Sequence, residues 1–173
     1  MSEAPAIIYR EATAADSYAV AQVQVRSWQE SFKGLVPQSF LDGMSVEQRA
    51  EAFLKRAENG FYKMFLAEAQ GRGVVGFMDI GRSRDSQRPY EAELYAIYIL
   101  KEFQRMGIGR RLFNSGIEAA LAVGMNSMYL IALEVSPYKS FYEKLGGCRV
   151  SRQVIALGGV EYYALVYAWD KLR

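Results

Sequence analysis

The sequence predicts one α+β domain that covers residues 1–173. Of these 173 residues 51% are hydrophobic, which is enough to build one buried core. Stretches rich in β-branched and aromatic residues are interleaved with stretches whose apolar residues recur at helical spacing. No repeat, low-complexity tract or linker divides the chain. The elements therefore belong to one folding unit.

The first strand is predicted over residues 6–12, AIIYREA. Thr13 and Asp16 have the spacing of a capping box and predict the start of a helix. The apolar residues that follow recur at helical spacing: Ala21, Val25, Trp28 and Phe32. Gly34 and Pro37 then interrupt this pattern and predict a loop.

A second helix is predicted over residues 45–60 and ends at Gly60, a residue type favoured after the last helical turn. Residues 61–70 and 74–83 are two apolar stretches on either side of the sequence GRG. This pattern predicts a β-hairpin.

The rest of the chain continues to mix strands and helices. Strands are predicted over residues 92–100, 127–135, 149–157 and 161–169, and an amphipathic helix over 112–124. A short helix is predicted within residues 136–147. Ser136 would be its N-cap, Pro137 its first residue and Gly146 its C-terminal cap.

Composition narrows the classes of function. Lys plus Arg is 21 and Asp plus Glu is 19, and a net charge of +2 argues against a dedicated nucleic-acid surface. The single cysteine, Cys148, can form no internal disulfide, so we expect a cytoplasmic protein. We expect neither a signal peptide nor a membrane span. Histidine, the commonest general base and metal ligand, is absent, and no metal site is expected.

Residues 103–113, FQRMGIGRRLF, carry two glycines just before a helical pattern. A tight turn before a helix directs free N–H groups and the positive end of the helix dipole at one place, which favours phosphate. Gly107 and Gly109 would let a phosphate approach the backbone closely. Three arginines add positive charge: Arg105, Arg110 and Arg111. The sequence lacks both a Walker lysine and the three-glycine dinucleotide fingerprint, and a plain helix start explains the spacing equally well.

Residues 104–109, QRMGIG, match the Q/R-x-x-G-x-G/A signature of the GCN5-related N-acetyltransferases. Residues 94–109 resemble that family's fourth strand and pyrophosphate loop, and residues 141–147, FYEKLGG, are similar to its segment after the fifth strand. The resemblance is closest over residues 93–147. It implies an α/β three-layer form of the α+β class, in which helices flank a mixed, mostly antiparallel sheet of about seven strands.

The resemblance also implies acetyl-CoA as co-substrate. The pantetheine arm would bond to backbone groups of the fourth strand, and the pyrophosphate to the amides of the turn. The expected coenzyme-binding residues are Ile97, Tyr98, Ile99, Gln104, Arg105, Met106, Gly107, Ile108, Gly109, Arg110 and Ser136. Ser136 stands where many members of the family carry an asparagine that contacts pantetheine, so this particular contact is open.

Tyr142 is the candidate general acid, by the same resemblance. A phenol with a pKa of about 10 is protonated at neutral pH and could donate to the departing sulfur. The alternative is an ordinary buried aromatic beside Phe141. Without histidine, a carboxylate acting through water is the candidate base: Glu93 first, with Glu91 and Glu30 as fallbacks. Each of these carboxylates could equally be a solvated surface group.

The implied activity is transfer of an acetyl group to a small-molecule amine, amino-acid-like in its chemistry. Trp28, Phe32 and Tyr95 could line the acceptor pocket, although core packing explains them as well. A protein N-terminal amine is the alternative acceptor. A non-catalytic acetyl-CoA sensor, a nucleotide-binding regulator and a structural protein are the other classes considered. A homodimer is the assembly common in the family.

Overall fold

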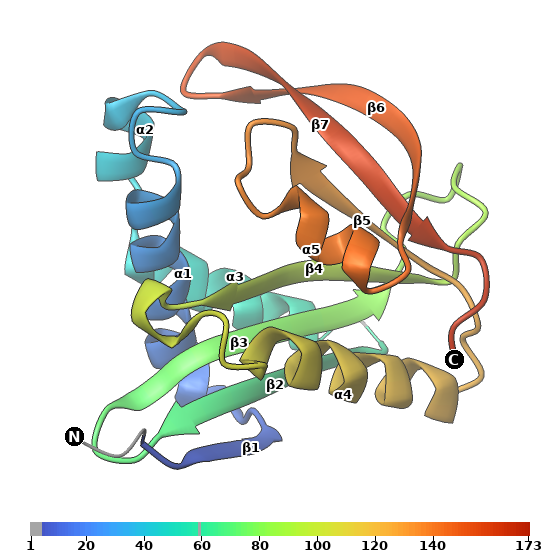
Figure 1. Cartoon of the computed structure of the whole chain (residues 1–173), viewed down its shortest axis with the longest axis horizontal. Helices are drawn as coiled ribbons and strands as arrows, with labels where there is room; N and C mark the ends of the chain where they lie inside the picture. The colour runs from blue at the N-terminus through green and yellow to red at the C-terminus, as the bar shows by residue number, and fades with distance from the viewer. Residues whose placement is uncertain (1–4, 59) are drawn as a thin grey trace.

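The computed structural model describes residues 5–58 and 60–173, which form one sheet with helices on both faces (Figure 1). The strands are β1 (Ile7–Glu11), β2 (Tyr62–Ala69), β3 (Gly73–Arg82), β4 (Ala92–Ile99), β5 (Met128–Leu133), β6 (Cys148–Leu157) and β7 (Val160–Trp169). The α-helices are α1 (Ser17–Ser31), α2 (Gln38–Asp42), α3 (Val46–Ala57), α4 (Ile108–Ala122) and α5 (Lys139–Lys144). Two short 3-10 helices are η1 (Ala14–Asp16) and η2 (Lys101–Phe103). None of the helices in this described part of the chain has the length and apolarity needed to cross a membrane.

The sheet is mixed and mostly antiparallel, as expected. Its strand order is β1-β2-β3-β4-β5-β7-β6, and β4 with β5 is the parallel pair. Parallel neighbours need a crossover connection, and η2, the turn and α4 supply it here. The hairpin predicted around GRG is confirmed as β2 and β3, which pair antiparallel from Tyr62 to Ala69.

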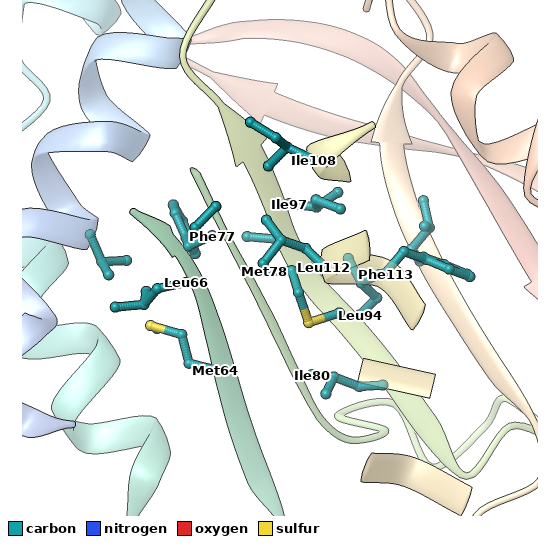
Figure 2. Packing of buried hydrophobic residues seen from close by; sticks show 14 of the residues in the cluster. Met64, Leu66, Phe77, Met78, Ile80, Leu94, Ile97, Ile108, Leu112 and Phe113 are labelled. Atoms are coloured by element: carbon teal, nitrogen blue, oxygen red, sulfur yellow. The ribbon is translucent and has the colours of Figure 1, made fainter. Parts of the chain in front are cut away.

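The core lies on both faces of the sheet. Phe77 of β3 packs against Phe53 of α3, with ring centroids 5.5 Å apart. The next residue, Met78, faces α4, where the absence of a side chain at Gly116 leaves room for its methyl group. Figure 2 shows these buried side chains: Met64, Leu66, Phe77, Met78, Ile80, Leu94, Ile97, Ile108, Leu112 and Phe113. This packing fixes β3 and β4 between the two helical layers.

Local expectations were mostly confirmed, with corrections at short elements. The helix predicted from residue 112 begins at Ile108, because Gly107 already acts as its N-cap. Helix α2, five residues long, was not predicted, since so short an element leaves no periodic pattern. The prediction that Ser136 caps α5 was wrong: Tyr138 is the N-cap, and Ser136 lies in the preceding turn.

The predicted end of α5 is confirmed in detail. Gly146 has a φ of 87°, a left-handed conformation that a residue with a side chain adopts at a cost. Its N–H donates to the Glu143 carbonyl, and the N–H of Gly147 donates to the carbonyl of Tyr142. These two hydrogen bonds form a Schellman motif. The motif ends α5 at Lys144, two residues after Tyr142.

Candidate active site

Strands β4 and β5 pair only at their beginnings and then diverge. Their register contains two pairs, Ala92 with Met128 and Glu93 with Tyr129, although both strands continue for several residues. The Leu100 N–H donates to the Val75 carbonyl of the β3 edge. Because backbone groups alternate along a strand, Ile97 and Ile99 direct theirs toward β5 and Tyr98 directs its own toward β3. Within the described residues, β4 and β5 form no further pairs, so the gap offers backbone groups to an extended ligand, except the Ile99 carbonyl, which accepts from Gln104.

The turn after η2 has an unusual backbone. Arg105 has a φ of 63° and Gly107 a φ of 82°, both in the left-handed region. The Arg111 N–H donates to the Gly107 carbonyl and is the first bond of α4. The N–H groups of the residues just before Arg111 therefore have no acceptor within the helix. A left-handed turn that leads into a helix N-terminus concentrates such groups into an anion-binding concavity.

Gln104 fixes the turn to the end of β4. Its side-chain amide nitrogen donates to the Ile99 carbonyl at 3.0 Å and lies 3.3 Å from the Tyr138 hydroxyl. That hydroxyl also contacts the Ser31 hydroxyl of α1 at 3.1 Å. One chain of hydrogen bonds therefore links the turn, the segment before α5 and the end of α1. Sequence reasoning missed Tyr138, because nothing local to it indicates partners so far away in the chain.

The arginines of the turn are available to a ligand. Arg105 and Arg110 are exposed, and neither is paired with a carboxylate in the part of the chain that the structure describes. Arg111 instead lies over the ring of Tyr9, 5.2 Å from its centroid. Met106 is 44% exposed and Ile108 is buried, so Ile108 anchors the start of α4 in the core. Arg105 and Arg110 thus add positive charge to the turn, with no carboxylate paired to either among residues 5–58 and 60–173.

Gly109 has a packing role that differs from that of Gly107. A Cβ on Gly109 would lie 3.0 Å from the Phe141 ring and 3.3 Å from the Ile99 side chain. At Gly107 the same addition would meet no protein atom within 4 Å. Gly109 therefore lets α5 approach the start of α4, whereas Gly107 serves the left-handed backbone of the turn.

Tyr142 lies on α5 and is partly buried among aromatic rings. Its ring centroid is 5.6 Å from those of Phe141 and Tyr167. Burial, with smaller effects of nearby Tyr98 and Tyr167, raises the pKa of Tyr142 well above its usual value. No hydrogen bond to its hydroxyl is found within the described ranges. The structure therefore places a protonated, unpartnered phenol near Tyr98 of the diverging strand.

The side chain of Tyr98 lies between β4 and α1. The Trp28 indole N–H donates to that hydroxyl at 2.8 Å. Burial raises the pKa of Tyr98 to about 12, against the opposing effects of this bond and of nearby Arg49 and Arg56. Two tyrosines with raised pKa values, Tyr98 and Tyr142, thus lie near each other beside the diverging strand β4.

Glu93 is buried rather than solvated, with 3% of its surface exposed. Arg84 donates to it from its backbone N–H at 3.1 Å and from its guanidinium at 3.0 and 2.6 Å. The Tyr129 hydroxyl donates at 2.8 Å. Both carboxylate oxygens are therefore occupied, at the start of β4 where the two strands still pair.

The other expected polar residues have local partners. The Glu30 carboxylate accepts from the Arg26 guanidinium at 2.8 Å on the exposed side of α1. Glu91 accepts from the Asn126 backbone N–H at 2.6 Å. The hydroxyl of Ser136, which is 7% exposed, accepts from the Tyr138 N–H at 3.2 Å. Of these three, only Ser136 is joined, through Tyr138, to the hydrogen bonds that link the turn to the end of α1.

A buried polar cluster beside β4 was not predicted. Asp79 of β3 is fully buried and accepts from Arg56 and from the Tyr62 hydroxyl, each at 2.9 Å. Burial raises the pKa of Asp79, against the lowering effects of these partners. Tyr95, expected to line an acceptor pocket, instead contacts the guanidiniums of Arg56 and Arg84, which lie 5.3 and 4.2 Å from its ring centroid. The sequence signal that could have indicated this cluster is Asp79, an aspartate within the otherwise apolar strand β3.

Comparison with known proteins gives a family. Residues 23–147 match the model of the family described as acetyltransferase (GNAT) family. The chain is 31% identical over 166 residues to the uncharacterized N-acetyltransferase YuaI of Bacillus subtilis, covering 96% of this chain and 94% of that protein.

Solved structures share the fold at low identity. The PaiA N-acetyltransferase of Thermoplasma acidophilum, solved with coenzyme A, superposes with a TM-score of 0.72 at 18% identity, over 95% of this chain and 99% of that one. A ribosomal-protein-alanine N-acetyltransferase of Brucella melitensis gives 0.74 at 19% identity, over 94% and 98%. The chain thus has the overall fold of these proteins.

Proposed function

The chain belongs to the acetyltransferase (GNAT) family and is an acetyl-CoA-dependent acetyltransferase, and from that premise we propose the rest of its reaction. The acceptor is the primary amine of a small, amino-acid-like molecule. It attacks the thioester directly while both substrates are bound. The observation that carries the proposal is the divergence of β4 from β5 beside a turn rich in free N–H groups.

The divergence suits the pantetheine arm, because an extended chain can pair with a strand edge. The backbone groups of Ile97 and the N–H of Ile99 would take part in this pairing, because the Ile99 carbonyl already accepts from Gln104, whereas the backbone of Tyr98 faces β3. The turn from Gln104 to Arg110 would hold the pyrophosphate on its N–H groups. Ser136 would contribute its buried hydroxyl near the same arm.

Transfer requires that the amine nitrogen bonds to the acyl carbon and that the carbon–sulfur bond breaks. The departing sulfur needs a proton or a strong hydrogen bond. We assign this donation to the Tyr142 hydroxyl, which is protonated and has no protein partner within the described residues. A backbone N–H at the open edge of β4 would stabilise the negative charge that develops on the carbonyl oxygen.

The attacking nitrogen loses one proton, and Glu93 stays the proposed base. Because Arg84 and Tyr129 occupy both of its oxygens, the proton would reach Glu93 through the Tyr129 hydroxyl or through water. An acceptor whose amine is already partly neutral lowers this demand. An α-amine, with a pKa of about 7.7–8.0, meets this condition better than a lysine side chain at about 10.4.

One observation favours a second acceptor class. The Brucella melitensis neighbour is named a ribosomal-protein-alanine N-acetyltransferase, and its TM-score is 0.74. A protein N-terminal amine is therefore the alternative acceptor, with the same chemistry at the nitrogen. We further propose that the protein acts in the cytoplasm and that it forms a homodimer. Sedimentation of the purified chain would test the homodimer.

The proposal is tested by free-thiol release from acetyl-CoA in the presence of amines, amino acids and short peptides. We expect release with small α-amines and little with peptides. In parallel, acetyl-CoA and desulfo-CoA should both raise the melting temperature, because each binds the native state. No shift at millimolar coenzyme, together with no thiol release, would contradict the proposal.

A further inference from the structure

A hollow of about 480 Å³ lies between α4, the end of α5 and the segment after β7, which are neighbours in Figure 1. Its volume is in the range of small-molecule sites. Helix α4 forms one wall through Arg110, Phe113, Asn114 and Ile117, and α5 contributes Lys144. Residues 168–173 line another part. This space is called the α4–α5 hollow below.

The α4–α5 hollow begins at the turn that is proposed to hold the pyrophosphate. Arg110 belongs to both, because it is the third residue of α4 and also lines the hollow. From Arg110 to Ile117 the lining positions recur at helical spacing, so this wall runs about 10 Å along α4 from its N-terminal end. The rings of Phe113 and Trp169 pack together, with centroids 5.3 Å apart, and form an apolar base. A group attached to a pyrophosphate at the turn is therefore adjacent to the hollow.

Positive charge outweighs negative charge in the lining. The cationic side chains are Arg110, Lys144, Lys171 and Arg173, against the single acidic side chain of Asp170. All four cationic side chains are exposed. None of them forms an ion pair or a side-chain hydrogen bond within residues 5–58 and 60–173. The hollow thus gathers cations from three parts of the chain without neutralising them.

Other arginines of the protein are neutralised by neighbouring carboxylates. Arg10, Arg26 and Arg84, for example, are each in an ion pair. In the hollow, Asp170 acts on a tyrosine instead: burial raises the pKa of Tyr90, and Asp170 adds to this effect. A cleft lined by charges of one sign attracts counter-ions and raises their local concentration. The α4–α5 hollow therefore favours an anionic ligand.

Coenzyme A carries a suitable anion at a suitable place. Its ribose bears the pyrophosphate at the 5′ oxygen and a separate phosphate at the 3′ oxygen, so a second anion lies one sugar away from the pyrophosphate. With the pyrophosphate on the N–H groups of the turn, the ribose lies beside Arg110, where the hollow begins. The ammonium group of Lys144, on the neighbouring helix, is a compact charge with three donors that suits a phosphate.

We propose that the α4–α5 hollow binds the 3′-phosphoadenosine end of the coenzyme and that Lys144 binds its 3′-phosphate, so that the protein discriminates against 3′-dephospho-coenzyme A. The inference rests on the proposed position of the pyrophosphate at the turn. Lys171 and Arg173 add to the positive potential, and the exposed amide of Asn114 offers donors and an acceptor to the base. Lys144 thus determines coenzyme specificity and has no part in the chemical step.

The test compares coenzyme A with 3′-dephospho-coenzyme A by calorimetric titration of the native protein, Lys144→Met and Lys144→Arg. The native protein should bind the dephospho form about 10- to 100-fold more weakly, as for lost charge-assisted hydrogen bonds. Lys144→Met keeps the apolar stem without the charge. It should weaken the binding of coenzyme A about tenfold, and leave the affinity for the dephospho form unchanged. Lys144→Arg should restore most of the difference, and the KM of acetyl-CoA should rise in Lys144→Met.

The matched control is Lys139→Met, because Lys139 lies on the same helix but does not line the hollow. This variant should keep the ratio of the two affinities found in the native protein. Added salt should lower that ratio in the native protein and leave it nearly constant in Lys144→Met, since salt screens exposed charges.

The outcomes separate this inference from the function on which it rests. If coenzyme A binds and thiol is released, but the native protein binds both forms equally, the inference is wrong while the proposed function stands. The same holds if Lys144→Met keeps the full difference between the two forms. If neither form binds and no thiol is released, both are wrong.

Discussion

At the scale of single residues, the hydroxyl of Tyr142 carries the proposed acid step. Tyr142→Phe keeps the ring and its packing against Phe141 and Tyr167. We expect kcat to fall about 100-fold, toward the lower end of general acid effects, with little change in the KM of acetyl-CoA or in melting temperature. Steady-state kinetics with a good acceptor measures this.

The control for this variant is Tyr167→Phe. Tyr167 packs against Tyr142, but its hydroxyl donates to Glu143 at 3.3 Å and not toward the gap. Tyr138→Phe would be a poor control, because the Tyr138 hydroxyl contacts both Gln104 and Ser31. Full activity in Tyr142→Phe would remove Tyr142 from the mechanism and leave coenzyme binding unaffected.

The raised pKa of Tyr142 also predicts a pH dependence. Because its folded pKa lies well above 10, the phenol keeps its proton across the range in which an ordinary tyrosine begins to ionise. The kcat of the native protein should therefore not decline between pH 8 and pH 10 through loss of this acid. A decline near pH 10 that is absent in Tyr142→Phe would show that the hydroxyl ionises at its ordinary pKa.

At the scale of elements, the turn before α4 needs its two glycines for different reasons. Gly107→Ala forces a side chain into a left-handed conformation, which costs about 1–2 kcal/mol. We expect coenzyme affinity to fall about tenfold with kcat little changed. Gly109→Ala instead displaces Phe141, the neighbour of Tyr142, so kcat should fall as well.

Calorimetric titration with desulfo-CoA, after circular dichroism has established folding, distinguishes these effects. Arg111→Ala is the matched control, because its guanidinium lies over Tyr9 and not over the turn. If Arg111→Ala weakens binding more than either glycine variant, side-chain charge rather than backbone geometry dominates the site.

The junction of β1, η1 and β2 depends on one ionic cluster. The Arg10 guanidinium donates to Asp16 at 2.7 Å and to Glu68 at 2.8 Å. The hydrogen bond from Arg10, helped by those from Thr13, holds the pKa of Asp16 well below its usual value. Asp16→Asn should lower the free energy of unfolding at pH 7 by about 1–2 kcal/mol.

The sign of this pH dependence follows from the lowered pKa. The stabilisation by Asp16 is fully present above its unfolded pKa of about 3.9 and is lost as pH falls toward the lower folded value. Urea unfolding at pH 7 and pH 3 should therefore show a smaller difference between the native protein and Asp16→Asn at pH 3. Glu11→Gln, which removes an exposed pair with Lys63, should have almost no effect at either pH. An equal difference at both pH values would contradict the ionic explanation.

At the scale of the whole molecule, the open edge of β4 predicts where ligand binding protects the backbone. With desulfo-CoA bound, amide hydrogen exchange should slow in peptides that contain Ile97 and Ile99 and in those over residues 105–110. The hairpin of β6 and β7, which pairs along its length, should change little and serves as the internal control. Protection confined to residues 105–110 would mean that the pantetheine arm does not lie between β4 and β5.

The sheet separates the helices into two layers. Figure 1 shows α3 behind β3 and β4 and α4 in front of them, which agrees with the packing of Phe77 on α3 and of Met78 on α4. The proposed coenzyme turn leads directly into α4, on the face of the sheet opposite α3.

Local sequence determined most of the elements and one part of the site. Periodicity predicted the seven strands and the longer helices, because side-chain direction repeats within each element whatever lies next to it. The QRMGIG stretch indicated the coenzyme turn, since glycine permits backbone conformations that few other residues adopt, and Gly107 does have a φ of 82°. The five-residue helix α2 and the start of α5 were missed because one turn of helix leaves no period to detect.

Only the tertiary structure decided which groups are occupied and which are free. Glu93 and Arg49 look alike in sequence, as charged residues within amphipathic stretches. In space Glu93 is bound by Arg84 and Tyr129, whereas Arg49 has no carboxylate partner in the described part of the chain. The approach of Tyr142 to Tyr98 likewise joins residues 44 positions apart (142 − 98). Ion pairing and desolvation depend on distances that chain crossing sets, so no local pattern could have predicted them.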